Sequence, residues 1–527
     1  MRESVSSWAP LRNGVFRAIW IAVLVSNTGT WMQTVGAQWL VVHAAHAAIL
    51  VALVQTSDYL PDFLFGLVGG VLADIFDRRR LLMAVQLSLS LVGIALTVLT
   101  FLGQMPPALL LTFTFVLGSS SAFTNPAYQS LIPELVPRGQ LRAASALGSV
   151  SINVARLVGP ALAGLVIARI GVAAVFGLNA ASYLFFGIVV ALWRPRRSMT
   201  RELPERFLSA MRAGGRYVRS APVVRRVLLR ATLFLIPASV LWALLPVVAS
   251  QRLQLGATGY GLLLGTLGAG AVAGGFALTR VRRTLSDNAL LLGASGVYAL
   301  ALVILVAVPS APLAAVVLLA AGAAWMAVLS NINAYLQLFL PAWVRARGLS
   351  VYQMVLFGSL ALGSLLWGLL GEISGVVPAF LVSAATLLAG MVTFRWWPLI
   401  ETASMDRATS AHWPEPHLAV DAPRRGQRIM VRNLYTISSE KERPFLEAMR
   451  QVRLSRQRTG ATSWALYRDG ERPDQFIELY EVASWDEHLR QHRQRQTGTD
   501  REVEEAADRL SDSPPQVSHL IAIDDAR

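Results

Sequence analysis

Long apolar runs separated by short polar segments fill the first 400 residues of the chain. A helix that crosses a bilayer needs about 20 mainly apolar residues, and each of these runs is long enough to form one. The twelve runs cover residues 17–42, 47–75, 80–103, 107–132, 143–169, 172–193, 224–250, 258–281, 287–308, 312–338, 346–372 and 376–397. This pattern predicts an all-α membrane protein with twelve spans.

The pattern changes after residue 397. Residues 398–426 contain proline, histidine and charged side chains without periodicity, which is typical of a linker. Beyond it, the periodicity predicts strands and helices in the order β-α-β-β-α-β, at residues 428–436, 440–457, 461–468, 474–483, 485–511 and 517–524. This order is typical of a small α+β ferredoxin-like domain, which we expect to cover residues 427–527.

Landmarks in the first half of the apolar region recur in the second half. The pair Gly69-Gly70 returns as Gly274-Gly275, 205 positions later, and Gly159 and Gly164 return as Gly363 and Gly368, 204 positions later. Matching landmarks at matching offsets indicate a duplicated bundle. We therefore expect a six-helix bundle at residues 1–193, a cytoplasmic connector at 194–223 and a second six-helix bundle at 224–397.

Charge sets the orientation of these spans. The chain is 54% hydrophobic and carries a net charge of +15, which in a soluble protein would suggest nucleic-acid binding. Here the arginines gather in alternate loops, at Arg78–Arg80, Arg138 and Arg142, 194–223, Arg280–Arg283, and Arg345 with Arg347. The positive-inside rule places these loops and both termini in the cytoplasm. We expect a multi-pass protein of the cytoplasmic (inner) membrane that binds no nucleic acid, and the lack of cysteine excludes disulfides.

Ionisable side chains inside the predicted spans are rare and therefore candidates for function. Asp58 and Asp62 are four residues apart on one face of the second span, and a rise of about 1.5 Å per residue puts Asp62 near the middle of the bilayer. Such a pair suits the uptake and release of protons, or it pairs with buried donors as a structural feature. Arg156, at similar depth in the fifth span, is either its counter-ion or a structural arginine.

Two segments resemble signatures of the major facilitator superfamily. Residues 69–82 read Gly-Gly-Val-Leu-Ala-Asp-Ile-Phe-Asp-Arg-Arg-Arg-Leu-Leu and are similar to its cytoplasmic gating loop between spans two and three. The positions that fall on this loop pattern are Gly70, Asp74, Arg78 and Arg79. In span five, Gly159, Pro160 and Gly164 resemble the antiporter signature of drug and metabolite exporters.

The resemblance also implies where a substrate would bind. In this superfamily spans one, four, seven and ten line the central path, and here they carry polar and aromatic side chains that suit an amphipathic organic molecule. These candidates are Asn27, Trp31, Gln33, Asn125, Gln129, Trp242, Trp325, Asn331 and Tyr335. Each is equally suited to a hydrogen bond with a neighbouring helix.

Longer stretches narrow the resemblance to one branch. Enterobactin-exporter-like facilitators are similar to this chain at residues 123–129 and 178–183 in the spans. The tail resembles that of the transmembrane secretion effector transporters at residues 456–461 and 484–492. Membership implies export of a small siderophore- or drug-like molecule by alternating access, driven by proton antiport. An importer of the same fold is the alternative within transport.

The tail allows an alternative of another class. Its expected fold is shared with small cofactor-free monooxygenases, and Trp464, Trp485, His488 and His492 would then form a reactive pocket. The same residues serve equally as a dimer core and a polar helix face, and a fold alone does not give a function. We expect a transporter, not an enzyme, with no cofactor and no metal, and with possible dimerisation through the C-terminal domain.

Overall fold

The structure, a computed structural model, describes residues 7–193, 215–402, 405, 406, 408, 410, 413 and 427–522. Most of the expected connector and linker lies outside the described residues. The chain divides into two compact units. The first contains Met1–Pro204, Leu228–Ile332 and Tyr352–Pro398, and the second contains Glu205–Val227, Asn333–Val351 and Leu399–Arg527.

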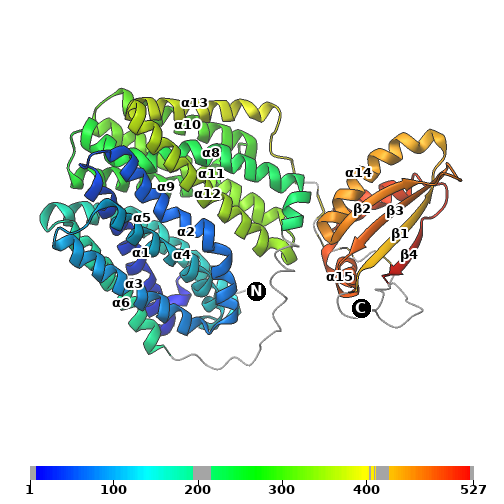
Figure 1. Cartoon of the computed structure of the whole chain (residues 1–527), viewed down its shortest axis with the longest axis horizontal. Helices are drawn as coiled ribbons and strands as arrows, with labels where there is room; N and C mark the ends of the chain where they lie inside the picture. The colour runs from blue at the N-terminus through cyan, green and yellow to red at the C-terminus, as the bar shows by residue number, and fades with distance from the viewer. Residues whose placement is uncertain are drawn as a thin grey trace. The chain divides into compact units, whose positions relative to one another are not determined.

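Two groups of six helices form the bundle that the apolar runs predict (Figure 1). The first group is α1 (Gly14–Val41), α2 (Ala47–Ile75), α3 (Arg78–Phe101), α4 (Pro107–Leu135), α5 (Leu141–Arg169) and α6 (Val172–Leu192). The second is α8 (Pro222–Val247), α9 (Ala257–Val281), α10 (Asp287–Ala307), α11 (Ala311–Phe339), α12 (Ala342–Ser374) and α13 (Val376–Val392). A π-helical turn at Val248–Arg252 follows α8.

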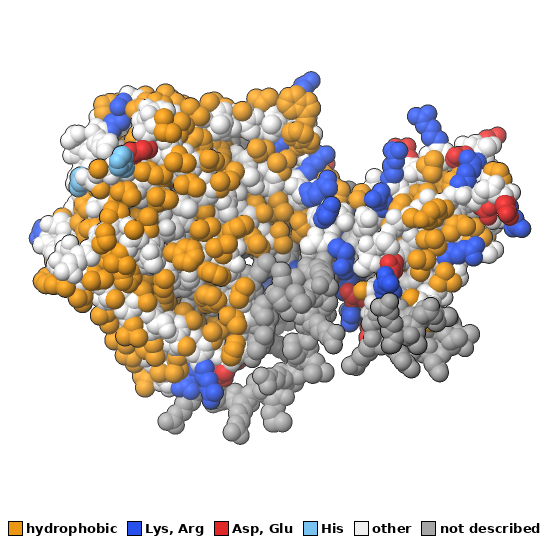
Figure 2. All heavy atoms as spheres, viewed as in Figure 1, with side chains coloured by type: hydrophobic (Ala, Val, Ile, Leu, Met, Phe, Trp, Pro, Cys, Tyr) orange, Lys and Arg blue, Asp and Glu red, His pale blue; other side chains and the backbone are white. Residues whose placement is uncertain are grey.

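Eleven of these described helices are long and apolar enough to cross a membrane. The exception is α1, for which the sequence also predicted a span. Its polar side chains, among them the buried Gln33 and Gln38, lower its average hydropathy while lying inside the bundle. Lipid-facing positions, in contrast, keep large apolar side chains exposed, such as Leu91 and Phe101 on α3. Hydrophobic side chains accordingly cover most of the bundle face seen in Figure 2.

Short polar side chains set the helix starts. The Asn13 carboxamide oxygen accepts hydrogen bonds from the backbone N–H groups of Val15 and Phe16, at 2.9 and 3.3 Å, and so caps α1. Asp77 accepts from the Arg80 N–H at 2.8 Å and caps α3. The break between α2 and α3 therefore lies inside the arginine-rich loop, where the sequence predicted it.

The internal repeat appears as equivalent helix contacts. A Cβ at Gly159 would lie 2.7 Å from the Trp31 Cβ on α1, and a Cβ at Gly363 would lie 2.6 Å from the Ile236 carbonyl oxygen on α8. Gly164 on α5 approaches Ala257 at the start of α9, and Gly368 on α12 approaches Ala52 near the start of α2. Residues 52 and 257 are themselves 205 apart, so the same contact is made twice, each time between the two groups.

The C-terminal domain has the expected strand and helix order. Its four-stranded antiparallel sheet runs β2-β3-β1-β4, the order of a ferredoxin-like fold. The strands are β1 (Ile429–Thr436), β2 (Ala461–Arg468), β3 (Gln475–Val482) and β4 (Gln516–Ile521). Helices α14 (Glu442–Thr459) and α16 (Gly498–Asp508) pack on one face, where Phe445, Met449 and Ala507 meet Tyr435 and Phe476.

One predicted helix of this domain is divided. The sequence predicts continuous helix over 485–511, whereas the structure has α15 (Trp485–Arg490), a π-helical turn (Gln491–Arg495) and then α16. The Thr497 side chain accepts from the Asp500 N–H, and the Asp500 carboxylate accepts from the Thr497 N–H at 3.0 Å. This capping box starts a new helix and explains the break.

Candidate functional site

The two acids of α2 lie where helices α2 and α4 approach closely. A Cβ at Gly118 of α4 would lie 2.7 Å from the Asp58 carbonyl oxygen. One turn further on, the Ser121 hydroxyl donates a 2.6 Å hydrogen bond to Asp62. The carboxylates of Asp58 and Asp62 interact electrostatically, so the structure brings together the pair that the sequence predicted. Pro61 lies between them inside the helix and leaves one helical hydrogen bond unmade.

Arg156 and the two acids each lie within range of the Tyr59 side chain, which is uncharged at neutral pH. The Arg156 guanidinium lies 5.5 Å from the centre of the Trp31 ring. Among the described residues no ion pair joins Arg156 to Asp58 or Asp62, and the buried Arg156 Nε makes no hydrogen bond there. Arg156 is therefore held beside an aromatic ring rather than locked to a carboxylate.

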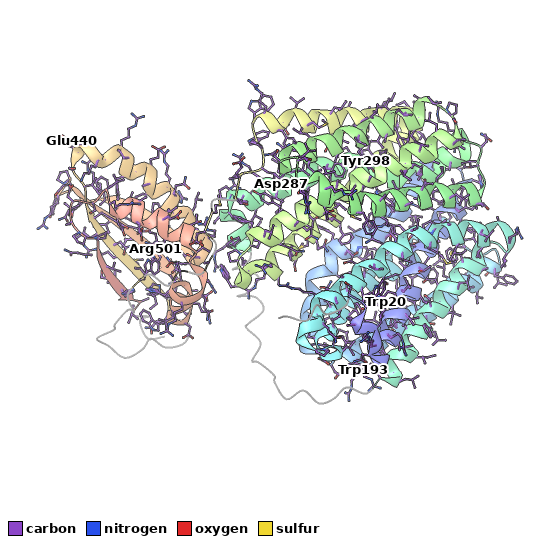
Figure 3. All side chains as sticks on the ribbon, turned by 180° about the vertical axis from the view of Figure 1, so that it is seen from behind. Trp20, Trp193, Asp287, Tyr298, Glu440 and Arg501 are labelled. Carbon is purple, nitrogen blue, oxygen red and sulfur yellow. The ribbon has the colours of Figure 1, made fainter. Side chains whose placement is uncertain are left out.

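A chain of aromatic rings continues from Trp31 into the second group of helices. The ring centres of Trp31 and Trp242 are 6.0 Å apart, and those of Trp242 and Trp325 are 5.5 Å apart. Beyond Trp325 lies Tyr298 at 6.2 Å, inside the second group (Figure 3), with its hydroxyl donating to the Ala238 carbonyl at 2.9 Å. The three predicted tryptophans thus form one continuous aromatic surface across both groups.

Three side chains and one backbone carbonyl next to this surface connect the two groups of helices. Gln38 of α1 donates to Gln55 of α2 at 2.8 Å and to the Trp242 carbonyl of α8 at 3.2 Å, and it accepts from the Tyr260 hydroxyl of α9. Trp242 is 204 positions after Gln38, and Tyr260 is 205 after Gln55. The network therefore joins equivalent positions of the two repeats, and we call it the amide gate (Gln38, Gln55, Trp242 and Tyr260).

Polar surface lies just beyond the amide gate, at the end of the bundle with the arginine-poor loops. Trp39 stacks on Tyr260 with ring centres 5.9 Å apart and lines a hollow of about 500 Å³ with His43, Gln251 and Gln254. At the same end, His46 of the α1–α2 loop and Glu372 of α12 approach to 2.6 Å. Both features connect the first group of helices to the second.

The remaining cavity candidates do not gather at the aromatic surface. Asn27 and Gln33 bond within the first group, to Ser151 at 3.5 Å and to Asn179, and Asn125 and Gln129 are exposed. Asn331 is buried, donates to the Asp287 carbonyl at 3.3 Å and accepts from Arg282, whereas the Tyr335 hydroxyl donates to the Ile400 carbonyl.

The arginines of the predicted gating loop bind helix ends. Arg78 donates to the Ser130 carbonyl at 3.0 Å and pairs with Glu134 at 2.5 Å, and Arg79 donates to the Val190 carbonyl at 3.1 Å. In the second repeat, Arg282 makes a similar 3.0 Å bond to the Ser330 carbonyl, one turn away from the position equivalent to Ser130. The side chains of Gly70 and Asp74 lie outside the described residues.

Sequence reasoning missed Gln38, Gln55, Tyr260 and Ser121. Spans one and two carry several polar residues each, and nothing in a single helical pattern separates those that face the other half. The repeat offset contained a usable signal, because it pairs Gln38 with Trp242 and Gln55 with Tyr260. Polar or aromatic residues at both equivalent positions mark sites where the two halves meet.

Comparison with known proteins agrees with this arrangement. The sequence pattern of the family described as "Transmembrane secretion effector", in the major facilitator superfamily, matches residues 5–527. The chain is 26% identical over 398 residues to the "Multidrug efflux pump Tap" of Mycolicibacterium fortuitum, a match that covers 72% of this chain and 95% of that protein. It is 29% identical over 178 residues to the "Staphyloferrin A transporter" of Staphylococcus aureus, covering 34% of this chain and 44% of that transporter.

Solved structures share the fold of the bundle. A bacterial homologue of the human lysosomal transporter Spinster, in an inward-facing and occupied conformation, superposes with a TM-score of 0.58 at 15% identity. The match covers 73% of this chain and 96% of that one. The peptide-transporter-family protein PepTSo superposes with a TM-score of 0.56 at 11% identity, covering 73% and 97%.

Proposed function

Because the chain belongs to the transmembrane secretion effector family of the major facilitator superfamily, we propose that it exports a small amphipathic organic molecule in exchange for protons. The substrate is drug- or siderophore-like and crosses the cytoplasmic membrane. Asp58 and Asp62 carry this proposal. They are two interacting carboxylates inside a helix that crosses the membrane, where acids without a function are disfavoured.

The surroundings of the acids suit coupling between proton and substrate. Arg156 lies between Trp31, 5.5 Å from its ring centre, and Tyr59, which neighbours Asp58 in the sequence. A flat, amphipathic substrate stacked on Trp31 and Trp242 would change the environment of Arg156 and, if Arg156 moves toward the acids, that of the carboxylates. A cationic substrate would also favour their charged form, so that its binding promotes proton release.

Alternating access needs a gate that opens and closes on each side of the site. The close glycine contacts, the amide gate and the His46–Glu372 pair all join the two groups at the arginine-poor end. We propose that this end faces the outside and is closed here, so that the site opens inward. Rocking of the two halves would break these contacts and release the substrate outside.

The names of similar proteins support export. They include the multidrug pump Tap and "Macrolide efflux protein A" of Streptococcus pyogenes, which is 23% identical over 236 residues. The match to the staphyloferrin A transporter covers less than half of that protein, and it supports a siderophore-like substrate only as a second class. A macrolide and a lipophilic dye are therefore the first substrates to test.

Asp62→Asn tests the coupling step. We expect proteoliposomes with the unmutated chain to accumulate erythromycin or ethidium faster when a pH gradient is imposed. Asp62→Asn should lose at least about ten-fold of this stimulation, because its amide cannot exchange a proton, while ligand binding followed by tryptophan fluorescence persists. Asp58→Asn should have a smaller effect, because Asp58 lies nearer the outer end.

The matched control is Asp287→Asn, the same chemical change at the exposed start of α10 (Figure 3). It should transport like the unmutated chain. An Asp62→Asn variant that still responds fully to the gradient would contradict proton coupling through this site. Failure of the unmutated chain to transport any substrate of a broad panel would contradict export itself.

The C-terminal domain adds a second contact surface. Met430 of β1 and Leu520 of β4 are paired neighbours on the sheet face opposite the helices, and both are exposed, at 37% and 47%. We propose that a second copy covers this face and that the domain dimerises. Sedimentation of the detergent-solubilised chain, compared with Leu520→Glu, checks this: the variant should be monomeric.

A further inference from the structure

Three of the chain's seven histidines meet inside the C-terminal domain. His488 lies on α15, His492 in the π-helical turn that follows, and His519 on β4. His488 is fully buried and His492 is 9% exposed. Their ligand nitrogens all lie within 4.8 Å of one another. We propose that these three imidazoles bind one divalent transition-metal ion, with Zn²⁺ the best match, and leave one coordination position for water.

The distances between the imidazole nitrogens are compatible with binding of all three to one metal ion. The Nε2 atoms of His488 and His492 are 3.2 Å apart, and those of His488 and His519 are 3.0 Å apart. Zinc binds histidine nitrogen at about 2.0–2.1 Å, and a tetrahedral arrangement then separates neighbouring nitrogens by about 3.3 Å. The two separations from His488 are close to this value, and the third lies within 4.8 Å.

Hydrogen bonds alone satisfy this cluster poorly. Each neutral imidazole Nε2 carries either one hydrogen or one lone pair, yet the His488 Nε2 faces two partners. Metals bind the uncharged imidazole, and one ion bound at all three Nε2 atoms would replace these competing contacts.

The local backbone favours a binding site. His488 and His492 are four residues apart, so they share one helix face, and His492 lies in a π-helical turn, a feature frequent at functional sites. The buried His488 Nδ1 and Gln491 Oε1 atoms have no hydrogen-bond partner within the described part of the chain. The two side chains nevertheless lie close to each other. A metal on Nε2 fixes the hydrogen on Nδ1, and Gln491 Oε1 is then its acceptor, as in outer shells of metal sites.

The surroundings are closed and electrically balanced. Trp413 packs edge-on against His492 with ring centres 4.4 Å apart, and Trp485 lies 5.5 Å from His488. Arg456 lies close enough to affect His488, and it is paired with Glu478 at 3.1 Å and with Glu504 at 2.7 Å. The repulsion that Arg456 would exert on a bound cation is therefore offset by two carboxylates. Imidazole ligands select zinc, copper, nickel or iron over magnesium and calcium.

Metal titration of the full chain tests the proposal. The chain is purified with a tag free of histidine, stripped with EDTA and titrated with ZnCl₂ against a chromophoric competitor. We expect one Zn²⁺ per chain, and Co²⁺ in its place should give the intense visible absorption of four-coordinate cobalt. His519→Gln should weaken zinc affinity by more than about 100-fold, beyond the 10–100-fold typical of outer-shell partners.

The matched control is His43→Gln, which removes an exposed histidine of the α1–α2 loop and should leave zinc affinity unchanged. His519 lies on the terminal strand and is only partly buried, so His519→Gln retains a polar side chain of similar size. Should that variant lose its fold, the cobalt spectrum of the unmutated chain decides alone. Weak six-coordinate cobalt absorption, less than about 0.2 equivalents of zinc, or equal affinity in His519→Gln would each overturn the site.

Discussion

Buried charge in the C-terminal domain is concentrated on a few paired residues. Glu478 is fully buried and pairs with Arg456 at 3.1 Å, while accepting from Asn433 at 2.6 Å and Trp464 at 2.8 Å. Burial alone raises the pKa of Glu478, but Arg456 and these hydrogen bonds outweigh it and hold the pKa below its ordinary value. The pKa of Asp500 is also held below its ordinary value: burial raises it, but Arg458 and the hydrogen bond from Ser455 outweigh this effect.

These shifts predict acid sensitivity of the domain. A carboxylate whose folded-state pKa lies below its unfolded value contributes stability above the unfolded pKa, and this contribution disappears as pH falls through the folded pKa. Glu478 and Asp500 start from ordinary values of 4.5 and 3.8. We therefore expect hydrogen exchange in residues 427–522 of the full chain to accelerate steeply as pH is lowered below about 4, after correction for intrinsic exchange. Unchanged protection down to pH 3 would contradict the assignment.

Removing one carboxylate of the buried ion-pair cluster should destabilise the domain at neutral pH as well. Glu478→Gln leaves Arg456 with one carboxylate, and breaking a buried ion pair typically costs about 3–5 kcal/mol, measured as lost exchange protection of β1 and β3. The control is Arg501→Gln, which removes the exposed Arg501–Glu505 pair of α16 (Figure 3) and should leave protection nearly unchanged. Equal effects of both variants would show that the core pair is not stabilising.

At single residues, the sequence indicated which side chains are candidates for function, but not which residues they contact. Two aspartates inside an apolar run are visible without a structure, because charge in a span is costly. His488 and His492 were named from the sequence as part of an alternative reactive pocket, without a metal. His519 was not, because its approach depends on β4 pairing with β1, where His519 faces Val431, and a single sequence does not give the register of strands far apart in the chain.

Among the helices, α5 shows why small residues lie where the halves meet. A Cβ at Gly164 would lie 2.5 Å from the Ala257 carbonyl oxygen, whereas one at Gly148, on the same helix, would contact nothing within 4 Å. Both glycines lie in the same α-helix, and they differ only in whether a neighbouring helix approaches them. Glycine is normally unfavourable inside a helix by about 0.5–1 kcal/mol relative to alanine, so its presence at 164 indicates a packing requirement.

Gly164→Ala should therefore destabilise the bundle while Gly148→Ala should not. The added methyl group forces α5 away from α9, and overpacking of this kind costs about 1–3 kcal/mol. We expect a lower midpoint of thermal unfolding in detergent and slower export for Gly164→Ala. Gly148→Ala, the matched control, should keep or slightly raise the midpoint. A Gly164→Ala variant as stable and active as the control would show that α5 and α9 need not approach this closely.

Element boundaries followed from local signals, and the exceptions have identifiable causes. Strand β2 was predicted at its observed bounds, and Gly460 directly before it ends α14. Residues 485–511 were predicted as one helix because their polar and apolar spacing is helical throughout. The π-helical turn and the capping box at Thr497 interrupt them.

For the whole bundle, the repeat offset predicted only a duplicated bundle, although the offset also relates residues that meet between the halves. Offsets of 204 and 205 relate Gly164 to Gly368, Ala52 to Ala257, and Gln38 to Trp242, and the structure makes each of these residues part of an inter-half contact. A duplicated bundle whose halves face each other uses the same surfaces twice. The offset alone did not give the depth of each contact, because depth depends on helix tilt and packing.

A reversible covalent link would test whether these contacts separate during transport. Cβ atoms at Ala48 of α2 and Gly371 of α12 would be 3.5 Å apart, and those at Ala161 of α5 and Gly265 of α9 would be 3.8 Å apart. Both distances lie in the range of about 3.5–4.5 Å that a disulfide needs, and the natural chain contains no cysteine. Ala48→Cys with Gly371→Cys should therefore cross-link under mild oxidation in the closed state of the arginine-poor end.

Oxidation of this double variant should abolish export, and a reductant should restore it, because the halves can no longer part at that end. Mass spectrometry of the double variant reports the fraction of chains that are linked. The single variants Ala48→Cys and Gly371→Cys, oxidised in parallel, control for damage by the oxidant. Full export by a completely cross-linked chain would mean that the arginine-poor end stays closed throughout transport, and rocking about the central site would then be wrong.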